Sequence, residues 1–203
     1  MREVGVSSDA ATLNSQPGPP AKVLDFNGRL TRTADQFREL VWPRVSAVFG
    51  PGRLAQVETQ GSDVARTLDL LGIDYLFTPD AGEPFGIASR VQAPASTGRP
   101  WDSFTMGTHQ YDRLRSAEVT AFGRLVPAVV IHAFVGQPAT LLSVGVTRVR
   151  DLLETAPTGS RYSQSGPFHY WTFDALRSAG RLIARLPDPN LVVPFSGQPE
   201  ARG

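Results

Sequence analysis

The chain has 203 residues, of which 41% are hydrophobic, and this is enough for one domain with its own core. It contains no cysteine, which excludes disulfides, thiolate metal sites and cysteine catalysis and agrees with a reducing compartment. The formal net charge of +1 excludes a global attraction to nucleic acid, so any such binding needs a local basic surface.

Hydrophobic patterning argues against a membrane protein. The apolar runs are far shorter than the roughly 20 residues that span a bilayer, and the N-terminus has no signal-peptide pattern. We therefore expect a cytoplasmic protein that does not enter a membrane. Lys22 is the only lysine, so arginine supplies every other cation. Base composition of the source genome explains this bias as readily as selection for phosphate binding does, although the planar guanidinium suits phosphates.

Composition divides the chain into a central domain and two ends. Residues 1–24 are rich in Ser, Gly, Pro and Ala without apolar periodicity, which predicts a disordered arm. Residues 187–203 contain further Pro and Gly and predict a flexible tail, with a short apolar patch at 191–195. The intervening residues 25–186 are expected to form a single domain.

The first half of this domain predicts two helices and a hairpin. A helix that begins at Thr33 presents apolar residues at helical spacing and is kinked or divided by Pro43. A second helix is capped by Ser62, continues through Val64, Leu68 and Leu71, and stops at Gly72. Turn residues at 78–82 then join two strands, 73–77 and 84–92, which we expect to pair antiparallel.

The second half alternates strands and helices. The expected elements are a strand at 101–106 with Phe104 inward, a helix from 108 to about 122, strands at 126–135 and 141–147, a short helix at 149–155 and a helix within 171–186. This order predicts a mixed α+β fold, in which a central mixed sheet of about five strands is flanked by helices.

The hairpin carries the most informative chemistry. Asp74 lies near the start of its first strand, and Arg90 lies on the second, two residues before Gln92. Residues two apart in a strand share a face, so a carboxylate and a guanidinium are expected to meet at one end of the hairpin. Oxygen ligands for Mg²⁺ beside a cation are what metal-assisted phosphodiester cleavage needs.

These residues resemble the core of the PD-(D/E)XK, or restriction-endonuclease-like, nucleases. The resemblance covers Gly72-Ile73-Asp74 and Gly86-Ile87-Ala88-Ser89-Arg90, within roughly residues 58–135. It implies a restriction-endonuclease-like fold and Mg²⁺-dependent cleavage of DNA. Asp74 matches the metal-binding Asp, Arg90 stands where the Lys belongs, and Glu58 or Glu39 matches the acid of a preceding helix.

The chain departs from that family at two positions. Ala88 replaces the second acid, which removes a metal ligand, and arginine at position 90 cannot deprotonate near neutral pH, so only charge stabilisation remains. Glu58, Glu83 and Gln92 are candidates to complete the shell. Simpler roles stay open: Asp74 as a strand-start residue that caps backbone amides, and Arg90 as a solvated or ion-paired strand residue.

Other candidate residues lie outside the hairpin. Tyr111 and Arg115 are spaced to share one helix face, near Arg113, and suit a nucleic-acid backbone, although solvated helix residues explain them equally well. We expect His132, between Ile131 and Ala133, to be a hydrogen-bonded core histidine, and His169 to belong to an aromatic cluster. Nucleotide-binding glycine loops and a Gly-x-Ser-x-Gly nucleophile elbow are absent from the sequence.

The sequence therefore leaves three functions to compare. The first is a nuclease-like protein that hydrolyses DNA, with Asp74, Arg90, Glu58 and Gln92 at the reaction centre and Tyr111, Arg113 and Arg115 on the DNA. The second is a catalytically inactive relative that binds nucleic acid or a protein partner. The third is an interaction module unrelated to nucleic acid, and a homodimer is compatible with each.

Overall fold

Two sheets organise the protein. The structure is a computed structural model that describes residues 32–57, 62–94, 98–116, 127–163 and 165–192. Seven strands form a large sheet in the order β1-β2-β3-β5-β6-β9-β10, and three form a small one in the order β4-β8-β7. The large sheet comprises β1 (Gly52–Gln56), β2 (Tyr75–Pro79), β3 (Phe85–Gln92), β5 (Val129–Gly136), β6 (Thr140–Arg148), β9 (Leu182–Leu186) and β10 (Asp188–Val192). The small sheet comprises β4 (Ser103–Gly107), β7 (Gly159–Ser163) and β8 (Gly166–Thr172).

The predicted fold class is confirmed. The large sheet is mixed because β3 and β5 run parallel while its other neighbouring pairs are antiparallel. The expected β2–β3 hairpin is present. With seven strands, the sheet is larger than the five expected.

An irregular helix covers one face of the large sheet. Helical backbone begins at residue 32 and continues through η1 (Phe37–Val41), α2 (Trp42–Val45) and η2 (Ser46–Val48). A π-helical turn precedes Pro43, which lacks the N–H that a regular helix uses, so the regular hydrogen bonding of the helix is interrupted near the predicted residue. Phe37 and Val41 are buried against the sheet, and Phe37 stacks on Tyr75 at 4.4 Å between ring centroids.

Helix α3 (Asp63–Leu70) begins and ends as predicted. The Ser62 hydroxyl accepts a hydrogen bond from the Ala65 N–H at 3.1 Å, and Gly72 has the positive φ of 80° that favours glycine. Val64 lies in this helix as predicted, and 69% of its surface is exposed. The neighbouring Ala65 is buried, together with Ile73.

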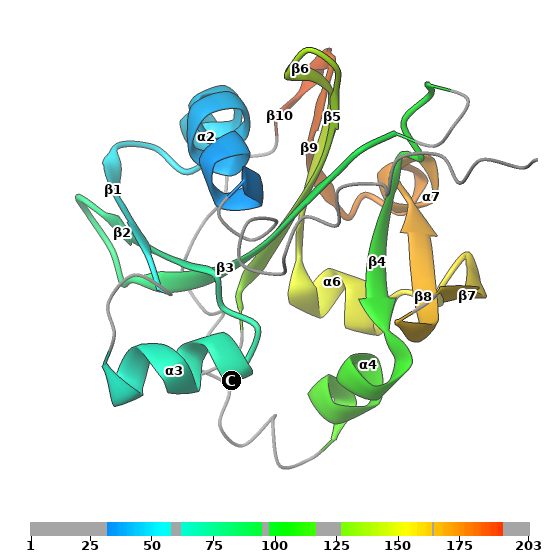
Figure 1. Cartoon of the computed structure of the whole chain (residues 1–203), viewed down its shortest axis with the longest axis horizontal. Helices are drawn as coiled ribbons and strands as arrows, with labels where there is room; N and C mark the ends of the chain where they lie inside the picture. Colours follow the sequence, from blue (N-terminus) through cyan, green and yellow to red (C-terminus); the bar gives the residue numbers. More distant parts are fainter. Residues whose placement is uncertain (1–31, 58–61, 95–97, 117–126, 164, 193–203) are drawn as a thin grey trace, which may run out of the picture.

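The small sheet and three helices cover the opposite face (Figure 1). These helices are α4 (Thr108–Arg115), α6 (Val149–Glu154) and α7 (Phe173–Ser178). Phe104 is buried as predicted, and Trp171 and Phe173 are buried beside it. The predicted C-terminal part of the helix at 108–122 lies partly outside the described residues.

The C-terminal third differs from the prediction. A helix was expected within 171–186, but α7 ends at Ser178 and β9 begins at Leu182. Gly180, with a φ of 67°, makes the turn between them. Strand β10 pairs with β9 and lies in the segment expected to be a tail. Strands β1, β7 and β8 also have no counterpart in the sequence prediction.

Candidate functional site

Strand register places four of the singled-out positions on one face of the large sheet. Tyr75 pairs with Ile87, and the Asp74 N–H donates to the Ile87 carbonyl at 3.0 Å. Asp74 is therefore opposite Ala88 in an antiparallel ladder, where opposite residues share a face. Alternation along β3 adds Arg90 and Gln92 to the same face.

The Asp74 carboxylate is held against the β3 backbone. Its Oδ2 accepts a hydrogen bond from the Ser89 N–H at 2.5 Å, and the Asp74 carbonyl accepts one from the Val57 N–H at 2.9 Å. Asp74 is half-buried. Asp74 thus caps a backbone amide, one of the two roles that the sequence left open. A carboxylate has about four acceptor positions in all, so this hydrogen bond does not by itself prevent the group from binding a metal ion.

Arg90 lies next to Gln92 on β3. With the Gln92 amide oxygen turned toward the guanidinium, this oxygen accepts from Arg90 Nε at 2.6 Å and Nη2 at 3.0 Å. Arg90 keeps an exposed surface, yet burial by the surrounding protein lowers its pKa. It has no ion pair with an acid in the described part of the chain, so its charge is available to an anion.

His132 is the neighbour of Arg90 in the parallel β3–β5 ladder. The ring is buried, and its Nδ1 lies 2.5 Å from the Ser103 carbonyl. A carbonyl only accepts, so Nδ1 carries the proton and Nε2 has a lone pair. Nε2 is buried and has no hydrogen-bond partner in the described structure. The expectation of a hydrogen-bonded core histidine is confirmed.

The environment keeps His132 neutral. Its pKa is lowered to about 3, chiefly by burial and also by the charge of Arg90, while the hydrogen bond to Ser103 acts in the opposite direction. No local pattern indicates that His132 and Arg90 are neighbours, because β3 and β5 pair across an intervening strand and helix. His132 is therefore a residue of this face that local patterns could not identify.

The metal-ligand set is incomplete in the described residues. No group of three His, Cys, Asp or Glu side chains that could hold a metal ion occurs among residues 32–57, 62–94, 98–116, 127–163 and 165–192. Glu58 lies outside these ranges, and Glu83 is exposed in the β2–β3 turn. Asp74 supplies a carboxylate oxygen of the kind that Mg²⁺ binds, whereas Ala88 supplies none.

The side of α4 that was expected to contact nucleic acid is partly buried in the core. Tyr111 is only 7% exposed and packs on His169 and Trp171, because it occupies the apolar side of the helix. Its hydroxyl accepts from Arg115 Nη1 at 2.8 Å, and the Arg115 guanidinium lies 5.3 Å from the ring centroid. Tyr111 is thus not placed to contact DNA, while Arg113 and Arg115 remain exposed.

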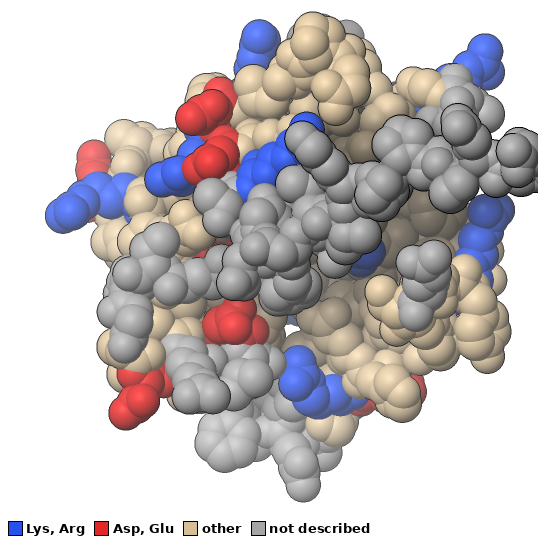
Figure 2. Space-filling view, viewed as in Figure 1, with Lys and Arg blue, Asp and Glu red and all other residues tan. Residues whose placement is uncertain are grey.

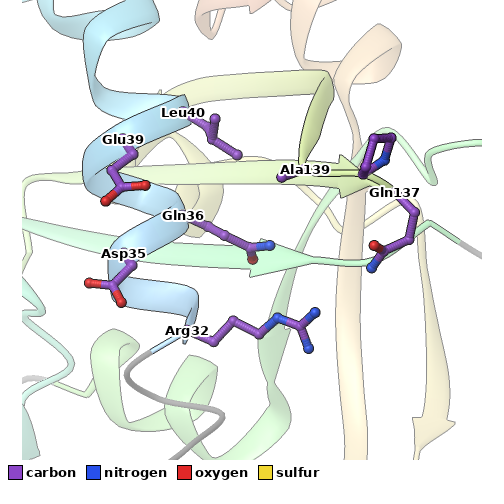
Figure 3. A pocket seen from close by; sticks show the side chains of 8 residues that line it. Arg32, Asp35, Gln36, Glu39, Leu40, Gln137 and Ala139 are labelled. Atoms are coloured by element: carbon purple, nitrogen blue, oxygen red, sulfur yellow. The ribbon is translucent and has the colours of Figure 1, made fainter.

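A separate pocket opens on the helix-covered face of the large sheet. Figure 3 shows Arg32, Gln36 and Leu40 projecting from the first helix toward the β5–β6 turn, which contributes Gln137 and Ala139. Its volume is about 700 Å³. Glu39, the alternative candidate for the helix acid, lines this pocket, whereas Asp74, Arg90 and Gln92 do not.

Comparisons with known proteins identify no relative. No family model matches the chain, and neither the curated proteins nor the solved structures contain a significant match. In the described part of the chain, no helix is long and apolar enough to cross a membrane.

Proposed function

We propose that this protein hydrolyses phosphodiester bonds of DNA with the help of Mg²⁺, in the manner of PD-(D/E)XK nucleases with a restriction-endonuclease-like fold. One observation carries the proposal. The register of β2 and β3 supports a common face for Asp74, Arg90 and Gln92, and Arg90 there has no acidic partner among the described residues.

Each residue has a limited chemical role. Asp74 would bind Mg²⁺, with Glu58 as the further acid, and the bound ion would polarise the phosphate and activate water. Arg90 stays protonated at neutral pH, so it stabilises negative charge on the phosphate rather than removing a proton. Gln92 fixes the guanidinium through its amide oxygen.

A cleavage assay with matched variants tests this proposal. The full chain is incubated with single-stranded, duplex and supercoiled DNA in the presence of Mg²⁺ or Mn²⁺. Asp74→Asn and Arg90→Met are expected to lower cleavage by about a hundredfold or more, because each removes a charge at the reaction centre. Asp80→Asn, an exposed acid of the same hairpin, serves as control. Equal cleavage by wild type and Asp74→Asn removes the assignment.

A second candidate is a catalytically inactive module of the same fold that binds nucleic acid or a protein partner, as a monomer or homodimer. Ala88 at the second-acid position and the hydrogen bond from the Ser89 amide to Asp74 favour it. In the view of Figure 2, basic and acidic side chains are interspersed among the coloured atoms, without one large basic patch.

Metal titration separates the two candidates. The nuclease binds Mg²⁺ or Mn²⁺ at Asp74, and Asp74→Asn weakens that binding. The inactive module binds neither ion but binds DNA with an affinity that falls as salt increases. The lack of cysteine agrees with a reducing, cytoplasmic location, which is part of the same proposal.

A further inference from the structure

The small sheet has an aromatic face that points away from the core. Within β8, Trp171 is buried and His169 contacts Tyr111, so these two residues face the interior. Phe168 and Tyr170 alternate with them and therefore lie on the other face. Both are half-buried, as is Trp101, which precedes β4 at the edge of this face and also packs against the core cluster of Phe104 and Trp171.

These three rings hold an arginine in place. The Trp101 ring lies 5.1 Å from Tyr170 and 6.0 Å from Phe168, between centroids. Arg161 on β7 pairs with Phe168, and its Cζ lies 5.1 Å from the Trp101 centroid and 5.5 Å from that of Tyr170. Cation–π contacts of this kind order a long side chain without using its N–H donors.

The positive charge of this face has no acidic partner among the described residues. Strands β4, β7 and β8 contain no acidic residue, and Arg161 is exposed without an ion pair among the described residues. Asp102, the acid that directly follows Trp101, interacts with Ser143 and Arg185. The face therefore combines a pre-ordered cation with partly accessible aromatic rings.

A ligand that matches both features has negative charges and flat aromatic groups at regular intervals. Single-stranded nucleic acid has both, since each nucleotide offers a phosphate and a base with two open faces. A duplex hides the faces of its bases in the stack, and an acidic peptide offers charge without regular aromatic planes. Neither of these ligands would interact with both the arginine and the aromatic rings.

We propose that the outer face of the small sheet, formed by Trp101, Arg161, Phe168 and Tyr170, binds single-stranded nucleic acid. Arg161 donates to a phosphate, and bases stack on the accessible parts of the neighbouring rings. Binding tolerates different sequences because stacking does not distinguish the edges of the bases. The inference goes beyond cleavage at Asp74 and rests on different residues.

Binding is measured with the full chain in EDTA, which prevents metal-dependent cleavage. The fluorescence anisotropy of a labelled 20-nucleotide oligo-dT is compared with that of the same strand annealed to oligo-dA. We expect tighter binding to the single strand and a loss of affinity with added salt. Arg161→Ala and Trp101→Leu should each weaken binding on the order of tenfold, which is the effect of losing one stacking or charge contact.

Two variants serve as controls. Arg53→Ala removes an exposed arginine from β1, at the far edge of the large sheet, and Tyr162→Ala removes an 85% exposed aromatic residue beside Arg161. Both should bind like wild type, and circular dichroism melts confirm that each variant is folded. If Trp101→Leu unfolds, the oligonucleotide-dependent quenching of tryptophan fluorescence is compared instead between wild type and Trp101→Phe, where it should decrease.

Several outcomes overturn the proposal: no binding by wild type at micromolar concentration, equal affinity for single strand and duplex, equal competition by polyglutamate, or an Arg161→Ala affinity equal to that of Arg53→Ala. The results of this binding assay and of the cleavage assay test the two proposals independently. Binding that survives in Asp74→Asn without any cleavage rejects the nuclease proposal and supports this one. Cleavage without Arg161-dependent binding does the reverse.

Discussion

His132 is a titratable side chain sealed between the two sheets. Its ring is buried next to Phe104 and Phe134, its Nδ1–H donates to Ser103, and the charge of Arg90 is nearby. Burial is the main reason that its pKa falls to about 3. In the unfolded chain an ordinary histidine has a pKa of about 6.5, so folding must exclude a proton from this ring.

This difference predicts a pH dependence of stability. Because the folded pKa is the lower one, the unfolded chain binds more protons, and stability falls as pH decreases from about 6.5 toward about 3. Between pH 7.5 and 4.5, His132 should contribute about 2–3 kcal/mol of that loss. The free energy of unfolding in urea, measured at both pH values, gives the total loss.

The variant His132→Asn isolates this contribution. Its amide retains a donor to the Ser103 carbonyl but does not titrate, so its loss of stability between the two pH values should be smaller by that amount. Its absolute stability also changes because of the cavity, which does not affect the comparison. An identical pH dependence in wild type and variant would contradict the assignment.

At the scale of single residues, local chemistry was sufficient where the cause is local. Ser62 caps its helix and Gly72 ends it, since both depend on backbone groups within a few residues. The roles of Asp74 and Arg90 depend on which side chains approach from other strands, and a single sequence does not specify those. Val64 illustrates the same limit, because its exposure depends on which side of α3 meets Val57 and Ile73.

At the scale of elements, hairpins were predictable and long-range pairings were not. The β2–β3 and β5–β6 pairs are joined by short turns with recognisable residues. The small sheet instead joins β4 to β8 across more than fifty residues, and no local signal specifies such a pairing. Residues 171–186 suggested one helix because their apolar spacing suits α7, while β9 is extended through its pairing with β6.

Gly145 on β6 shows how closely α7 approaches the large sheet. A Cβ atom at this position would lie 2.5 Å from the Phe173 ring and 3.0 Å from Phe104. Both rings are buried, so a methyl group at this position requires the core around them to repack. Gly145→Ala should therefore lower the free energy of unfolding by about 1–3 kcal/mol, the usual cost of overpacking.

Gly136→Ala is the matched control for this effect. Gly136 lies at the end of β5, where the atoms nearest to an added Cβ belong to the half-buried side chain of Leu142, at 3.1 Å or more. That side chain can shift, so the expected change is below about 1 kcal/mol. Urea denaturation of both variants compares the two sites, and equal destabilisation would argue against a rigid contact at Gly145.

At the scale of the whole molecule, a group of hydrogen bonds and an ion pair connects the small sheet to the large one. Asp102, just before β4, is central to this connection. Its Oδ1 accepts from the Ser143 hydroxyl on β6, and its Oδ2 accepts from Arg185 Nη2 on β9 at 2.5 Å. The Asp102 carbonyl accepts from the Phe173 N–H at 2.9 Å, which adds α7 to the same junction.

Removing the charge of Asp102 should lower the free energy of unfolding more than removing the charge of Asp174. Asp102 and Arg185 keep only 26% and 20% of their side-chain surface exposed, so solvent screens the pair weakly, whereas Asp174, the second partner of Arg185, is 78% exposed. Asp102→Asn should cost about 1–3 kcal/mol of unfolding free energy, because Arg185 loses its buried partner. Asp174→Asn should cost less than about 0.5 kcal/mol, as exposed ion pairs contribute little. Urea denaturation followed by tryptophan fluorescence measures both variants, because Trp171 lies in the small sheet, Trp101 just before it and Trp42 on the first helix. If the two substitutions have equal effects, Asp102 does not join the sheets energetically, and apolar contacts such as those of Phe104 and Phe173 must do so alone.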